Sequence, residues 1–180
     1  VIDTNVLIQN PDALHCFEDN NLILPLVVVE ELDGLKKNEG ENGSNARSAV
    51  RILESYRNKG DLLKGVKLEQ GGTLRIEKNF KDVELPPDLP EDKADNRILK
   101  VCLGLFQQRK RGQQIVLVTK DIVLRLKAQI LGLRAEDFTT EQISEDDNMY
   151  LGRSQAYIPE DQVKLFKKHG VQLDALYISD

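Results

Sequence analysis

The sequence predicts an α/β fold, a three-layer α/β/α sandwich around a mainly parallel central sheet. Short apolar runs of strand length alternate along the chain with segments in which apolar residues recur at helical spacing. The run 115–118 is apolar at every position, which is typical of a strand buried on both faces of a parallel sheet. This alternation implies right-handed crossovers that place helices on both faces of the sheet.

Length and composition favour one folded domain with appendages. The chain has 180 residues, of which 40% are hydrophobic and 31% charged, so a sizeable core can form. The longest apolar run, 22–29, is interrupted by Pro25 and is far shorter than the ~18 residues of a membrane span. The two cysteines have no repeated spacing and nothing resembles a secretion signal, so we expect no disulfide framework and a cytoplasmic location.

The first elements alternate between strand and helix. Residues 1–2 are expected to end a buried strand, and Asn10 is expected to cap a short helix over 11–17 that begins with proline. A second strand is predicted over 22–26, and the apolar stretch that follows it leads into a helix over 27–37.

The next helix and a hairpin follow. Ser44 is expected to cap a helix that ends at Gly60 and buries one face. That face is formed by Ala46, Ala49, Val50 and Leu53. Segments 66–70 and 73–77 flank a Gly-Gly pair, which predicts a β-hairpin. A proline-rich stretch then returns the chain to the main body, so the hairpin is interpreted as an insertion over about 61–90.

The last elements complete the alternation. A helix is predicted over 91–111, then the buried strand, then a helix over 121–131 and a short strand over 133–135. The core face of the first of these helices is expected to hold Ile98, Val101, Cys102, Leu105 and Phe106. The domain is therefore expected to span 1–138.

Residues 139–180 are expected to form a C-terminal extension or linker with one helix near 159–169. The chain begins without methionine inside an apolar stretch, which suggests a fragment of a larger protein.

Acidic residues recur where ligands bind in open parallel sheets, beyond the carboxyl ends of strands. They are Asp3, Glu30 or Glu31, Asp95 and Asp121. Crowded carboxylates repel one another unless cations hold them, and oxygen ligands favour Mg²⁺ or Mn²⁺. Each acid also has a structural alternative: a turn residue for Asp3, acids favourable at helix N-termini for the glutamates and Asp95, and a helix cap for Asp121.

Four ordered segments resemble the motifs of PIN-domain nucleases. These segments are 1–7, 24–33, 95–99 and 118–121, and their order and spacing agree over residues 1–135. More narrowly, 45–47, 124–128 and the tail resemble the PIN domain that precedes the ATPase in PhoH-like proteins. The resemblance implies a PIN-like domain, with a possible ATPase domain following in the full-length chain.

The resemblance implies that Asp3, Glu31, Asp95 and Asp121 are the catalytic, metal-binding set, with Asn5 and Thr119 in support. Glu31 is preferred to Glu30 because it directly precedes Leu32, and because neighbouring helical residues point about 100° apart. Asp33 and Asp92 do not match the motif positions of the family's acids, so they are excluded from the proposed metal-binding set. Asn96 stands where the family often has a second acid.

The implied activity is metal-dependent hydrolysis of single-stranded RNA. Two ions about 3.5–4 Å apart can activate a water and stabilise the leaving oxygen. Neither His15 nor His169 lies in the four motifs, so neither is expected to be catalytic.

The net charge of −5 becomes −1 when the four proposed ligands are set aside, so the remainder does not oppose RNA binding. Arg47, Arg125 and Lys127 are the candidates for phosphate contacts. Few aromatic residues are available to stack on bases, so weak sequence specificity is expected.

Alternative functions were weighed on the same residues. Asn5 stands where an Asp-x-Asp phosphatase needs its second acid, and the chain has no P-loop motif. The main alternative is a PIN-like module of a larger PhoH-like protein that binds RNA or protein without cleaving. Other expected partners are a second copy of the chain and an inhibitory antitoxin-like protein, and no membrane.

Overall fold

The computed structural model describes residues 1–139, 156–157 and 177–178. The chain divides into two compact units, Val1–Thr139 and Thr140–Asp180. In the second unit, strand β6 (Ala156–Tyr157) pairs antiparallel with strand β7 (Tyr177–Ile178). The helix expected near 159–169 lies outside the described residues.

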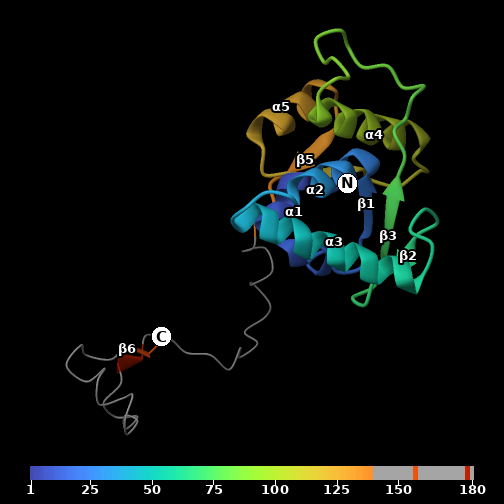
Figure 1. The fold of residues 1–180 in the computed structure, drawn as a ribbon. Helices are drawn as coiled ribbons and strands as arrows, with labels where there is room; N and C mark the ends of the chain where they lie inside the picture. The colour runs from blue at the N-terminus through green and yellow to red at the C-terminus, as the bar shows by residue number, and fades with distance from the viewer. Residues whose placement is uncertain (140–155, 158–176, 179–180) are drawn as a thin grey trace, which may run out of the picture. The chain divides into compact units, whose positions relative to one another are not determined.

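The sheet of the first unit is mainly parallel, as the sequence predicts. Its strands are β1 (Asn21–Pro25), β2 (Val66–Lys67), β3 (Thr73–Glu77), β4 (Val116–Val118) and β5 (Arg134–Glu136). β1 pairs in parallel with β3, and β4 with β5, whereas β2 pairs antiparallel with β3 at an edge (Figure 1). Ile2 joins the two groups of strands, because it forms a parallel bridge with Val118 and its N–H donates to the carbonyl of Ile23 at 3.0 Å.

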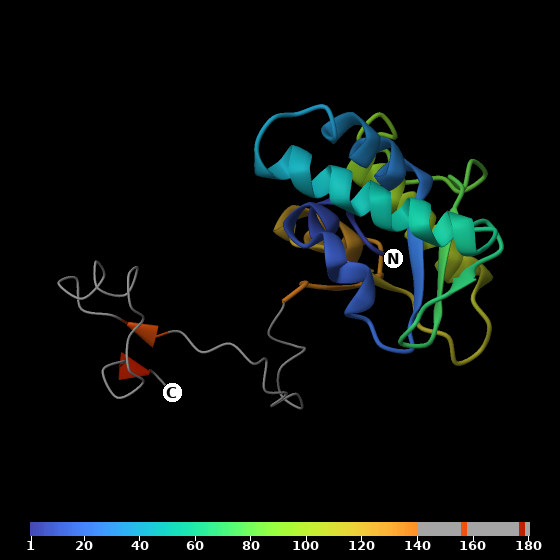
Figure 2. The ribbon, with the colours of Figure 1, turned by 60° about the horizontal axis from the view of Figure 1, so that its bottom comes forward.

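Helices cover the sheet and give a three-layer α/β/α sandwich. They are α1 (Thr4–Gln9), the 3₁₀ helix η1 (Pro11–His15), α2 (Leu26–Leu35), α3 (Glu41–Lys59), α4 (Ala94–Gln108) and α5 (Ile122–Ile130). α3 contacts α1 and α2, whereas α4 contacts α2 and α5. Figure 1 shows α4 and α5 together at the top of the view and α3 across its lower part, and Figure 2 shows the same layers turned.

The N-terminal region differs from the prediction in two places. The chain enters α1 directly after Asp3, where only a polar turn was expected, and the predicted helix over 11–17 is the shorter η1. The side chain of Asn10 caps η1 as expected, by accepting from the N–H of Asp12 at 3.1 Å. The apolar run after Pro25 is helical from its first residue, so no strand continues over 27–29.

Helix α3 begins four residues earlier than predicted. Its N-cap is Gly40, which has a φ of 84° that residues with a side chain rarely adopt, and Ser44 is exposed within the helix. Gly43 packs so tightly that a Cβ atom there would clash with the carbonyl of Asn38. Steric constraints on two glycines, rather than a capping hydroxyl, therefore set this start.

Both strands of the predicted hairpin belong to the main sheet. β3 pairs with β1 over its whole length and lies between β1 and β2. Leu74 of β3 is fully buried in the core of the unit. The glycine pair at the turn was predicted correctly, but the partner that buries the second strand is more than 45 residues distant in sequence, so a local pattern could not identify it.

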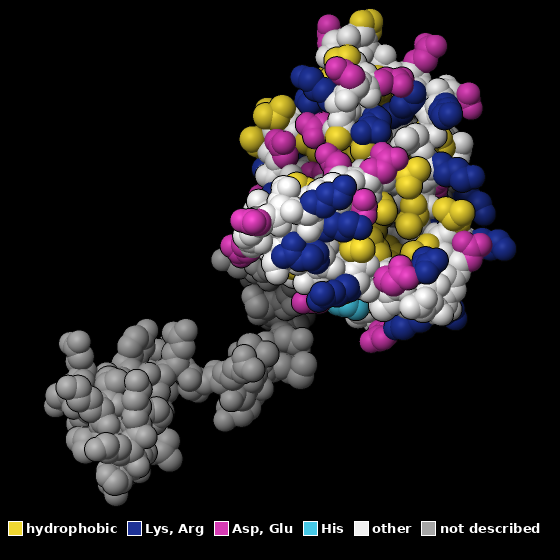
Figure 3. All heavy atoms as spheres, in the orientation of Figure 1, with side chains coloured by type: hydrophobic (Ala, Val, Ile, Leu, Met, Phe, Trp, Pro, Cys, Tyr) yellow, Lys and Arg dark blue, Asp and Glu magenta, His cyan; other side chains and the backbone are white. Residues whose placement is uncertain are grey.

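Most large apolar side chains of the described helices are buried, but α5 leaves one apolar face in solvent. Its exposed residues are Ile122, Val123, Leu126 and Ile130, and Figure 3 shows hydrophobic side chains gathered where Figure 1 places α5. Among the described residues, no helix combines the length and apolar character needed to span a bilayer.

Candidate functional site

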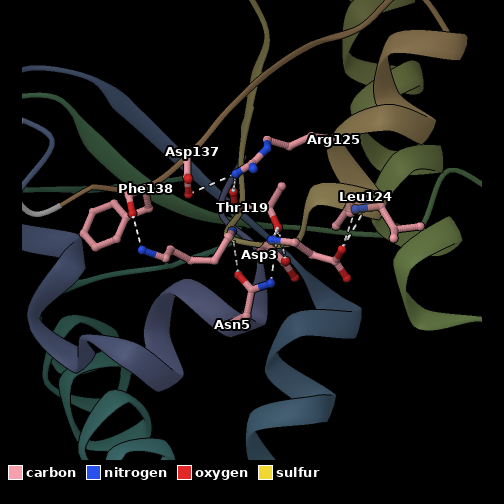
Figure 4. A network of polar contacts seen from close by, with 10 residues as sticks. Asp3, Asn5, Thr119, Leu124, Arg125, Asp137 and Phe138 are labelled. Carbon is pink, nitrogen blue, oxygen red and sulfur yellow. Dashed lines mark hydrogen bonds and ion pairs between the residues drawn. The ribbon is translucent and has the colours of Figure 1, made fainter.

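Asp3 lies at the centre of a buried polar network. It follows the bridge residue Ile2, caps α1, and is only 5% exposed. Its Oδ1 accepts from the N–H of Thr4 at 2.6 Å, and its Oδ2 accepts from the hydroxyl of Thr119 at 2.5 Å. Figure 4 shows Asp3 and Asn5, at the start of α1, close to Thr119, which follows β4. Asp3 is therefore held in place by both of its oxygens.

The surroundings of Asp3 disfavour its ionised form. Burial raises its pKa from 3.8 to about 6, against the lowering effect of the hydrogen bonds from Thr119 and Thr4. The negative charges of Asp95 and Glu31 raise the pKa further. Carboxylates from three separate segments therefore act on one small region.

Thr119 organises this network. It directly follows β4 and is fully buried, and besides donating to Asp3 its hydroxyl oxygen accepts from two groups. These are the side-chain amide of Asn5 at 3.3 Å and the N–H of Asp121 at 3.0 Å. Asn5 in turn accepts from the N–H of Lys120 at 3.1 Å. The two predicted supporting residues, Asn5 and Thr119, thus connect the start of α1 to the end of β4.

Replacing Thr119 with valine is expected to destabilise the protein by about 1–3 kcal/mol, because three buried polar groups lose a partner. The pKa of Asp3 should rise further, since a hydrogen bond that lowers it is removed. Thr119→Ser keeps the hydroxyl and should remain close to wild type. Urea denaturation of both variants in mildly alkaline buffer checks this, and equal stability of the two would contradict it.

Glu31 and Glu30 face different surroundings on α2. Glu31 is half-buried, and its Oε2 accepts from the hydroxyl of Thr4 at 2.5 Å. Glu30 is exposed and pairs with Arg97 at 3.3 Å. Thr4 is not among the residues that the sequence predicts for the site, although it lies inside the first motif. It connects the two acids, because its N–H contacts Asp3 and its hydroxyl contacts Glu31.

Asp95 lies in the first turn of α4 and faces a cation. The ammonium of Lys127, on α5, is 3.4 Å from its Oδ2. Lys127 is largely buried. This ion pair connects α4 to α5 and places a positive charge beside one of the proposed metal ligands.

Asp121, like Asp3, caps a helix with its carboxylate. It is the N-cap of α5, and its Oδ1 accepts from the N–H groups of Val123 at 2.7 Å and Leu124 at 3.3 Å (Figure 4). Its structural alternative, a helix cap, is therefore present. Across residues 1–139 and the two short described strands, no three His, Cys, Asp or Glu side chains stand close enough together to hold one ion.

The predicted phosphate contacts have different surroundings. Arg47 donates to the carbonyls of Lys36 at 2.8 Å and Asn38 at 3.3 Å, and so holds the end of α2. Arg125 lies beside the network, because it donates to the carbonyl of Thr119 at 3.1 Å and pairs with Asp137 at 3.0 Å (Figure 4).

The histidines were expected to have no catalytic role. His15 lies within hydrogen-bond distance of the Tyr56 hydroxyl, at 3.3 Å, outside the network around Asp3. His169 falls outside the described residues.

Comparisons with known proteins match the first unit to a known domain family. A family model described as PIN domain matches residues 1–139. Three curated proteins, each named Protein PhoH2, are similar to the chain. The one from Bacillus subtilis (strain 168) is 41% identical over 162 residues, which is 88% of this chain and 37% of that protein. The one from Thermobispora bispora is 34% identical, over 94% of this chain and 38% of that protein.

The third relative, from Mycolicibacterium smegmatis, is 38% identical over 79% of this chain and 32% of that protein. The chain thus spans between about a third and two fifths of the length of the relatives it matches. The family model covers the entire first unit, including the network around Asp3. The chain belongs to the PIN domain family.

Proposed function

We propose that the domain is a divalent-metal-dependent endoribonuclease that hydrolyses phosphodiester bonds of single-stranded RNA. PIN domains are generally nucleases, and this chain belongs to that family. The observation that carries the proposal is the burial of Asp3 within the field of two further carboxylates. Such an arrangement costs free energy unless a cation binds there, so function rather than stability accounts for it.

The donor set fits a hard cation. Asp3, Glu31, Asp95 and Asp121 offer only oxygen ligands, which suits Mg²⁺ or Mn²⁺. When bound, two such ions would activate a water molecule and stabilise the leaving oxygen. Because Oδ1 of Asp121 accepts the hydrogen bonds that cap α5, only the second carboxylate oxygen is proposed as a metal ligand.

The chain's own residues would orient these ligands. Thr119 and Thr4 fix both oxygens of Asp3, and Thr4 also fixes Glu31. Lys127 balances the charge of Asp95 in the metal-free protein, and once displaced from Asp95 its ammonium is placed to contact an RNA phosphate. We propose Arg125 as the second phosphate contact, since it contacts Thr119 within the network around Asp3, whereas Arg47 contacts backbone carbonyls at the end of α2.

Cleavage of an end-labelled single-stranded RNA tests the proposal. Internal cuts in Mg²⁺ or Mn²⁺, absent in EDTA, are the expected result. A folded protein that binds RNA and cuts under none of these conditions would favour the alternative, a non-cleaving RNA-binding module. Two observations favour that alternative: the lack of a ready three-residue metal cluster among the described residues and the Lys127 ion pair.

Two substitutions of Asp121 separate its two proposed roles. Asparagine caps helices about as well as aspartate, whereas alanine costs about 1 kcal/mol. If Asp121 is a ligand, both variants lose cleavage, and only Asp121→Ala loses stability. Cleavage assays paired with urea denaturation check this. An Asp121→Asn variant that still cleaves RNA would show that Asp121 caps α5 and is not a metal ligand.

The partners of the whole protein are also proposals. An ATPase domain, a second copy of this chain and an antitoxin-like inhibitor are motivated by the resemblance to PhoH-like and PIN proteins, and each is open to a binding measurement with the longer protein.

A further inference from the structure

A cavity of about 680 Å³ lies at the edge of the sheet opposite Asp3. It is lined by the first residues of β1 and β3, the end of α4, and residues 113–115, which lead into β4. Asp3, Thr119 and Glu31 all follow the carboxyl ends of strands or of the bridge segment, whereas this cavity adjoins the strand beginnings. The two regions are therefore separated by the length of the strands (Figure 1).

The cavity is lined by positive charge. Lys64, Arg75, Arg109 and Lys110 contribute to it, and none of its lining residues, all in the described part of the chain, is acidic. Lys64 and Arg75 have acidic neighbours outside the lining, at 3.7 Å and 2.8 Å. An anion would thus meet several cations and no opposing carboxylate within the cavity.

Arg75 also presents a donor that the protein leaves unused. Its Nη2 pairs with Glu77, but its Nε is buried and has no hydrogen-bond partner within the described residues. A buried N–H without an acceptor costs free energy, and an oxygen of a bound anion would remove that cost. Arg109, which also lines the cavity, has its guanidinium over the ring of Phe106, 3.4 Å from the ring centroid, and this contact restrains its orientation.

The remaining lining suits an aromatic base. Leu22, Leu105 and Ile115 supply apolar surface, and Gln108 and Gln113 are among five side-chain amides that can both donate and accept hydrogen bonds. The volume is within the roughly 300–1,000 Å³ typical of small-ligand sites. Cations for a phosphate, apolar walls and amides therefore occur together in one cavity.

We propose that this cavity binds a nucleotide, with its phosphate at Arg75 and Arg109 and its base against the apolar wall near Leu105. The chemistry is shared by a free nucleotide and by one nucleotide of an RNA strand. The proposal does not depend on cleavage, because none of the lining residues belongs to the proposed carboxylate set.

Calorimetric titration of the 180-residue chain at low salt, with AMP, ATP, an oligouridylate and inorganic phosphate, tests this site. Arg75→Gln and Arg109→Gln are each expected to weaken nucleotide binding at least about tenfold, since each removes a charge-assisted hydrogen bond. Arg51→Gln, an exposed arginine of α3 outside the cavity, should bind as wild type does. Asp3 does not line the cavity, so the sensitivity of AMP and ATP binding to Arg75→Gln and Arg109→Gln separates this site from the proposed nuclease site.

The four titrants distinguish a free nucleotide from one nucleotide of an RNA strand. Binding of AMP or ATP that both variants weaken supports a free nucleotide, and binding of the oligouridylate alone with the same sensitivity supports an RNA strand. Binding of none of them, binding that neither variant weakens, or phosphate binding as tight as AMP binding would overturn the proposal. If thermal unfolding measurements show that Arg75→Gln is not folded, two other variants give the same test. These are Arg109→Gln and Lys110→Gln, at residues that line the cavity near the end of α4.

Discussion

Asp3→Asn is expected to lower metal-dependent cleavage of single-stranded RNA by at least about a hundredfold. Even partners outside the ligand shell of a metal change affinity or activity by about 10–100-fold, and Asp3 is proposed as a direct ligand. The substitution removes a charge without adding volume, and Asp3 lies in the middle of the buried network. The rate of cutting of a labelled RNA in Mn²⁺ measures the effect.

A matched control on a neighbouring acid isolates the role of the site. Asp33 lies on α2 two residues beyond Glu31, is exposed, and pairs with Lys36. Asp33→Asn removes the same charge and should cut at the wild-type rate. Titration of Mn²⁺ into the same proteins gives a readout independent of cleavage, and only Asp3→Asn should weaken it. An Asp3→Asn variant that cuts like Asp33→Asn would overturn the proposed mechanism.

In the metal-free protein, Asp3 should make stability increase as pH falls. Its pKa is raised from 3.8 to about 6 in the folded state, mainly by burial, so the folded protein holds this proton more tightly than the unfolded chain. Above pH 6 the ionised carboxylate destabilises the fold, and the penalty disappears as pH falls from about 6 to about 4. At about 1.4 kcal/mol per pH unit, the contribution is about 3 kcal/mol.

Asp3→Asn should remove this dependence and stabilise the metal-free protein at neutral pH. The NH2 group of asparagine, which replaces Oδ2, cannot accept a hydrogen bond from the hydroxyl of Thr119. Losing that bond costs about 1 kcal/mol. The net gain near pH 7 is therefore about 2 kcal/mol, and near pH 4 it should reverse to a loss of about 1 kcal/mol. Urea denaturation in EDTA at both pH values measures it. A variant less stable than wild type at pH 7 would show that Asp3 is not destabilising.

The sequence predicts the alternation of strands and helices because the apolar residues of each element recur at the spacing of a strand or a helix. The run over 115–118, the capping of η1 by Asn10 and the buried face of α4 depend on neighbours within a turn or a strand. The pairing of β3 with β1 was not predicted, because register between distant strands leaves no local signature. Helix α1 was missed for a related reason, since it has only six residues and is held by its cap and by packing against α3.

The sequence by itself determined the order of the elements, the family motifs and which acids follow strands or begin helices, because these depend on residue types at fixed short spacings. Only the tertiary structure decided which groups meet. It placed Thr4 between Asp3 and Glu31, and Lys127 beside Asp95. These contacts join residues that are mostly tens of positions apart, so chain folding, burial and charge set them rather than any local pattern.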